Sequence, residues 1–138
     1  MLRLAAGWRE RAPAALTAGI EKYVRGYGRS GDHGIIAIVS EVPVGAAWYR
    51  YLTGAISGYG YVADNIPELS LAVQPHARRM GVGTGLVVRL LADAATQRLP
   101  GLSLSVEPDN PARRVYERLG FESVAQAGAA WTMFRATL

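Results

Sequence analysis

The order of apolar and polar positions along the chain predicts strands and helices that follow one another. The runs GIIAIVS (Gly34–Ser40) and VGAAWYRYL (Val44–Leu52) are apolar and rich in β-branched or aromatic residues. With a turn at Glu41–Pro43 between them, they predict a β-hairpin. ELSLAV (Glu68–Val73) and LSLSVE (Leu102–Glu107) alternate between apolar and polar residues and predict two further strands.

Apolar residues at helical spacing predict three helices. The first covers Ala14–Arg25. The second opens in the stretch Arg78–Gly85 and runs for about four turns to Arg98, before Pro100-Gly101 ends it. The third has Asn110 as its N-cap and Pro111 at its first position.

The segments FESVAQA and AWTMFRAT at the end of the chain predict an antiparallel pair. Strand, helix and strand over Glu68–Glu107 predict one parallel crossover. The fold class is therefore α/β, with a mixed sheet flanked by helices, in a single domain over residues 1–138. No clear strand precedes the first predicted helix.

Composition removes several classes of protein. The chain has 138 residues, of which 50% are hydrophobic, with no cysteine and two histidines. Disulfides, iron–sulfur clusters and thiol nucleophiles are excluded, and we expect no metal site. No apolar run reaches the roughly 18 residues that a membrane span needs, and no secretory leader is evident. We therefore expect a soluble protein of the cytoplasm that does not bind membranes.

The basic residues are almost all arginine. Lys22 is the only lysine among 15 basic residues, and the net charge is +4. Arginine is suited to phosphate recognition, so a phosphorylated partner fits the composition, but solvated surface charge explains it equally well. The chain lacks the dense basic stripe of a nucleic-acid-binding protein, and we expect no nucleic-acid partner.

The stretch Arg78–Thr84 carries the candidate chemistry. Glycines at 81 and 83 let the backbone approach a ligand, and the helix that follows offers unpaired amides and a positive dipole end. This combination suits a pyrophosphate. The alternative is an ordinary turn before a helix.

The same stretch resembles the signature of the GNAT superfamily, the acetyl-CoA-dependent N-acetyltransferases. Its pattern Arg/Gln-x-x-Gly-x-Gly/Ala is met by Arg78, Gly81 and Gly83, and EPDNPARRVYERLGF (Glu107–Phe121) resembles the second family signature. The resemblance covers Val44–Phe121. It implies a mostly antiparallel central sheet with one splayed parallel strand pair.

The resemblance also implies a cofactor site. Acetyl-CoA, as co-substrate, is expected to lie against one strand and the start of the next helix, and the Val73 amide is expected at the thioester carbonyl. The residues implied are Leu71, Ala72, Val73, Arg78, Arg79, Gly81, Val82, Gly83, Thr84 and Asn110.

Two residues are implied as catalytic. Tyr116 matches the family tyrosine that protonates the leaving thiolate, and its alternative role is that of a core aromatic residue. Glu68 occupies a place where several GNAT enzymes carry a glutamate that acts as base; the alternative is a solvated carboxylate at a strand end.

The expected function is direct transfer of an acetyl group to a primary amine of an unidentified acceptor, by an acyltransferase that is a monomer or a homodimer. The rival hypotheses are an inactive module that senses acyl-CoA and a small arginine-rich nucleic-acid-binding protein. The sequence does not identify the acceptor.

Overall fold

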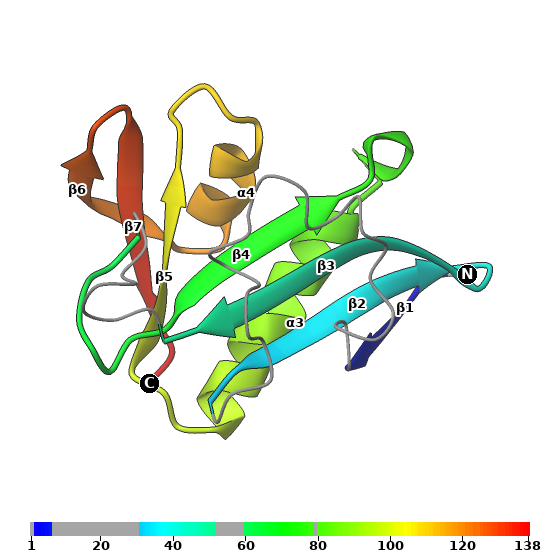
Figure 1. Cartoon of the computed structure of the whole chain (residues 1–138), viewed down its shortest axis with the longest axis horizontal. Coiled ribbons are helices and arrows are strands. Elements are labelled where there is room, and N and C mark those ends of the chain that lie inside the picture. The colour runs from blue at the N-terminus through cyan, green and yellow to red at the C-terminus, as the bar shows by residue number, and fades with distance from the viewer. Residues whose placement is uncertain (1, 7–30, 52–59, 79) are drawn as a thin grey trace. The chain divides into compact units, whose positions relative to one another are not determined.

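The computed structural model describes residues 2–6, 31–51, 60–78 and 80–138 (Figure 1). The chain divides into two compact units, Met1–Arg50 with Ser70–Leu90, and Tyr51–Leu69 with Leu91–Leu138. Each unit is described in turn. The helix predicted at Ala14–Arg25 lies outside the described residues.

The first unit contains strands β1 (Leu2–Ala6), β2 (His33–Val39), β3 (Val42–Arg50) and most of β4 (Glu68–Val73), in that order across the sheet (Figure 1). Strand β1 pairs antiparallel with β2 along its whole length. The expectation that no strand precedes the first helix was therefore wrong. A strand as short as β1 gains its stability from its partner, and that partner is distant in the sequence.

The turn between β2 and β3 comes earlier than expected. Val39 pairs with Val42, so the turn consists of Ser40 and Glu41, whose φ values are 49° and 67°. Two positive φ angles are typical of the type I′ hairpin turn. Pro43, expected in the turn, lies inside β3 next to the bulge opposite Ala37 and Ile38, where an interrupted ladder tolerates a residue without an N–H.

Helix α3 (Val82–Thr96) packs its first turns on the sheet of the first unit (Figure 1). A Cβ atom added to Gly45 in β3 would lie 3.2 Å from side-chain carbons of both Val82 and Leu86, so helix and strand are in close contact. The core here is mostly apolar, and it also holds the buried ion pair of Arg50 with Asp32. Its fully buried members include Ile35, Ile36, Ala46, Ala47, Leu86, Val87 and Leu90.

Helix α3 begins inside the predicted stretch Arg78–Gly85 and ends two residues before the predicted Arg98. The 3₁₀ turn η3 (Pro75–Ala77) precedes it, and Arg78 is extended, so the helix begins only at Val82. At the other end Arg98 has a φ of 59°, the left-handed conformation in which glycine was expected. Gly101 instead begins the next strand.

The second unit contains the start of β4, then β5 (Gly101–Val106), β7 (Ala130–Ala136) and β6 (Glu122–Ala127), in that order. The pairs β5–β7 and β6–β7 are antiparallel, and β4 and β5 are parallel. The prediction of a mixed, mostly antiparallel sheet with one parallel pair is confirmed. Helix α4 (Ala112–Arg118) lies between β5 and β6 in the chain.

Asn110 caps α4 as predicted. Its side-chain Oδ1 accepts a hydrogen bond of 2.9 Å from the amide of Ala112, and its carbonyl oxygen accepts one of 3.0 Å from the amide of Arg113. Pro111 already has helical dihedral angles, which agrees with its place at the first helical position.

Candidate active site

The candidate phosphate site lies in the first unit, where β4 leads into α3. Among the described residues, the first hydrogen bond of the helical type joins the Gly85 amide to the Gly81 carbonyl, at 3.0 Å. The amides of Val82, Gly83 and Thr84 precede it and have no acceptor inside α3 itself. The first turn also holds no acidic residue. This helix end thus offers backbone donors and a positive dipole to an anion.

The glycines at this helix end have different surroundings. Gly81 has a φ of 78°, and a Cβ atom added there would meet no described residue within 4 Å. A Cβ at Gly83 would instead lie 3.5 Å from Leu71 Cδ2 and 3.8 Å from Val73 Cγ2. These are ordinary van der Waals distances, so a side chain at position 83 would face β4. The role of Gly83 in binding a ligand stays a prediction.

The structure describes one of the two arginines expected at the site. Arg78 is exposed, and its amide donates a hydrogen bond of 3.3 Å to the Pro75 carbonyl. Arg79 lies outside the described residues. The Arg78 guanidinium is therefore accessible to an anion, and the role of Arg79 stays a prediction.

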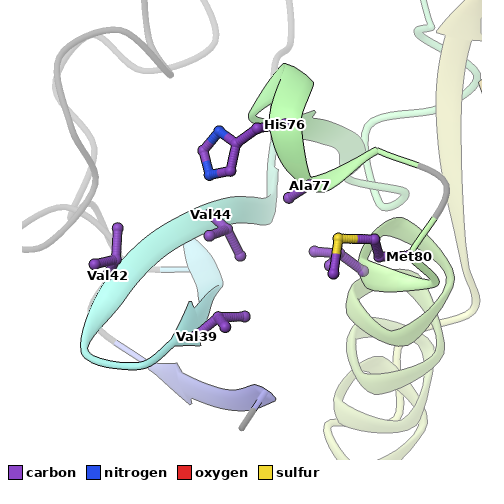
Figure 2. Close-up of a pocket in the computed structure, with 7 residues that line it drawn as sticks. Val39, Val42, Val44, His76, Ala77 and Met80 are labelled. Carbon is purple, nitrogen blue, oxygen red and sulfur yellow. The ribbon is translucent and has the colours of Figure 1, made fainter.

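An apolar pocket of about 260 Å³ adjoins this helix end (Figure 2). Met80 and Val82 belong to the approach and first turn of α3, and His76 and Ala77 come from η3. The wall opposite, drawn in Figure 2, is Val39, Val42 and Val44. With one imidazole and no charged side chain in its lining, this pocket suits an apolar group and does not suit a phosphate.

Glu68 lies in the second unit and is buried. It is the first residue of β4, only 2% of it is exposed, and its register partner is Ser103 in β5. The reading of Glu68 as a solvated carboxylate at a strand end is therefore wrong. Water covers little of this side chain, so the protein itself determines its behaviour as an acid or base.

Tyr116 is also buried in the second unit, with 6% of its surface exposed. Its ring meets that of Phe121 edge to face, with centroids 5.7 Å apart. Burial raises the pKa of the Tyr116 phenol above its usual value. The residue is thus a core aromatic whose hydroxyl stays protonated at neutral pH.

Sequence reasoning assigned no role to Ser103. The signal was present in LSLSVE, because alternation places Ser103 on the face opposite Leu102 and Leu104. What the sequence lacked was the parallel register that sets Ser103 beside Glu68. The alternating pattern alone marks the two serines of this strand only as polar positions.

A family model decides the classification. The model of the acetyltransferase (GNAT) family matches residues 5–121. The chain belongs to this GNAT family. Among the residues of this chain that the structure describes, no helix is long and apolar enough to cross a membrane. The same residues contain no cluster of three or more potential metal ligands.

Solved structures share the fold. The ribosomal-protein-S18-alanine N-acetyltransferase from Escherichia coli is 18% identical, with a TM-score of 0.72, over 99% of this chain and 94% of that one. A GNAT acetyltransferase from Staphylococcus aureus is 14% identical, with a TM-score of 0.72, over the full length of both chains. At such identities the likeness establishes the fold alone. No curated protein matched the sequence.

A third GNAT structure contains the coenzyme. The PaiA N-acetyltransferase from Thermoplasma acidophilum, solved with coenzyme A, is 17% identical with a TM-score of 0.62. The match covers 76% of this chain but only 60% of that one, so the present chain spans less than two thirds of its length.

Proposed function

We propose that this GNAT chain transfers the acetyl group of acetyl-CoA to a primary amine. The observation that carries the proposal is the start of α3, where three amides have no acceptor inside the helix, no described residue lies where a Gly81 Cβ would point, and the first turn holds no acidic residue. A pyrophosphate is the group that such a helix end holds best.

The residues present fit coenzyme A. The amides of the first turn of α3 take the pyrophosphate, and the Arg78 and Arg79 guanidinium groups add charge-assisted donors. The backbone of Leu71, Ala72 and Val73 binds the pantetheine amides, and the Val73 amide stabilises the developing oxyanion. The short pairing of β4 with β5 supports this role. It contains a single residue pair, Glu68 with Ser103, and does not include Leu71, Ala72 or Val73.

Glu68 acts as the base. An amine with a pKa of about 10.4 must lose a proton at pH 7, which costs about 4.6 kcal/mol, whereas an α-amino group with a pKa near 8 costs about 1.4 kcal/mol. Glu68 takes this proton, the amine nitrogen bonds to the thioester carbonyl carbon, and the carbon–sulfur bond breaks. The place of Glu68, buried at the start of β4 and in register with Ser103, supports this role because it fixes the carboxylate within the fold.

Tyr116 acts on the leaving sulfur. Its raised pKa keeps the phenol neutral, so it can donate a hydrogen bond and then a proton as negative charge develops. Coenzyme A then leaves as the thiol, Tyr116 regains a proton from water, and Glu68 releases the amine proton to water. The Asn110 side chain caps the backbone of α4. Contact with the coenzyme would be a second role of the same side chain.

The direct test measures the melting temperature of the full chain with acetyl-CoA and with pantetheine, which lacks the nucleotide. At 100 times its Kd, a specific ligand stabilises the folded protein by about 2.7 kcal/mol. We expect a clear shift with acetyl-CoA and a far smaller one with pantetheine. No shift with acetyl-CoA at saturating concentration would refute the proposed cofactor site.

A thiol-release assay then tests turnover with a panel of acceptors. The panel includes a polyamine, a lysine peptide and a peptide with N-terminal alanine, the last because enzymes from Escherichia coli and Brucella melitensis with this fold are named ribosomal-protein-alanine acetyltransferases. Release that depends on the acceptor supports the transferase. Tight coenzyme binding without such release on any amine would identify an acyl-CoA sensor instead.

A further inference from the structure

Ser103 and Glu68 are register partners in the parallel pair β4–β5. The Ser103 amide donates a hydrogen bond of 3.1 Å to the carbonyl of Pro67, which fixes the two strands at this point. Residues in register on neighbouring strands project from the same face of a sheet. The serine hydroxyl and the glutamate carboxylate thus emerge from adjacent positions.

Both side chains are buried, and the serine hydroxyl is unsatisfied. Ser103 is fully buried, and its Oγ has no hydrogen-bond partner among the described residues. A buried hydroxyl without a partner destabilises a fold, and native proteins rarely retain one without a reason. At this position alanine would fill nearly the same volume without that cost.

We infer that Ser103 is a positioning residue for Glu68, an inference that rests on the proposed function. In the complex with substrate, its hydroxyl donates a hydrogen bond to the Glu68 carboxylate, directly or through one water molecule. Hydrogen bonds of catalytic groups are commonly longer in a free enzyme and tighten when substrate binds. The bond holds the carboxylate in the orientation in which it accepts the amine proton.

The test is a double-mutant cycle on acetyl transfer. We expect Ser103→Ala to lower kcat about tenfold while KM for acetyl-CoA stays unchanged, because the cofactor site lies in other elements. In the Glu68→Gln background the same substitution should change kcat less than twofold, because the group that Ser103 orients is already inactive. Ser103→Thr, which keeps the hydroxyl, should restore most of the lost kcat.

Stability separates this role from a purely structural one. Removing an unsatisfied buried hydroxyl should leave the melting temperature of Ser103→Ala equal to or above that of the wild type. A variant that is at least as stable and yet slower cannot owe its loss to unfolding. Ser105→Ala, two residues along β5 and in register with Thr132, is the matched control and should keep full kcat.

Three results would overturn the inference. Unchanged kcat in Ser103→Ala, or an equal loss in the wild-type and Glu68→Gln backgrounds, would show that Ser103 does not act through Glu68; the proposed function would survive both results. A wild-type chain that transfers acetyl to no amine would overturn the proposed function and this inference together.

Discussion

The two units of the molecule present their polar groups in opposite ways. In the first unit the polar groups of the candidate site are backbone amides at the open start of α3, beside Gly81, and the exposed side chain of Arg78. In the second unit they are the buried side chains of Glu68, Ser103 and Tyr116. Open amides suit the capture of a large anionic carrier, and buried side chains suit proton transfer. Variants in the first unit should therefore change affinity, and variants in the second should change turnover.

The largest effect is expected from Glu68→Gln. Loss of a general base slows a reaction by about 10²- to 10⁴-fold, so kcat should fall within that range. The Kd for acetyl-CoA, measured by calorimetry, should stay within twofold of the wild type. Normal turnover in Glu68→Gln would show that Glu68 is not the base.

The first unit is tested by Gly81→Val. A branched side chain at Gly81 projects into the space that the proposed pyrophosphate occupies, and its positive φ adds strain of roughly 1–2 kcal/mol. We expect the Kd for acetyl-CoA to rise at least tenfold, with the folded state confirmed by circular dichroism.

Gly85→Ala is the matched control for Gly81→Val. A Cβ atom at Gly85 also meets nothing within 4 Å, but its φ is ordinary and it lies inside α3. This variant should bind acetyl-CoA normally and gain up to about 1 kcal/mol of stability from helix propensity. If both glycine variants bind equally well, the anion does not lie at this helix end.

Tyr116→Phe should lower kcat by about tenfold and leave the Kd for acetyl-CoA unchanged, because only the proton donor is lost. The same variant tests the pKa. Since burial raises the pKa of Tyr116, the folded state is favoured by the neutral phenol below about pH 10, and this stability is lost as the pH rises further. Wild-type protein should therefore lose more stability above pH 10 than Tyr116→Phe, as measured by urea unfolding.

The smallest effect is expected from Asn110→Ala. Loss of the cap on α4 should cost about 1 kcal/mol of unfolding free energy. Asn110→Ser, which keeps a capping oxygen, should recover most of this stability. A loss of acetyl-CoA affinity in both variants would show that the Asn110 amide also contacts the coenzyme.

Local pattern was sufficient for β4 and for the cap of α4. ELSLAV alternates and is followed by Gln74-Pro75, and the strand has the predicted bounds. Asn110 and Pro111 form a helix start that depends on neighbouring residues alone. The family resemblance of Arg78, Gly81 and Gly83 likewise identified the family that the family model matches.

Features that depend on distant partners were beyond the sequence. The pairing of β1 with β2 brings together residues more than 25 positions apart, such as Ala6 and Ile35. An acidic residue after a proline at a strand end is typical of a solvated position. Glu68 is instead buried, beside its register partner in β5, and the local sequence does not indicate this. The direction in which position 83 faces, toward Leu71 and Val73, depends on the packing of helix against strand, which spacing alone does not specify.

The turn between β2 and β3 is a place where substitutions should raise the stability of the folded protein. Ser40 and Glu41 both adopt left-handed backbone angles that asparagine and glycine accept at lower cost. The double substitution Ser40→Asn with Glu41→Gly should therefore give a parent chain with a more stable fold. In that parent, damaging substitutions at Glu68 or Tyr116 could be compared without the risk of unfolding.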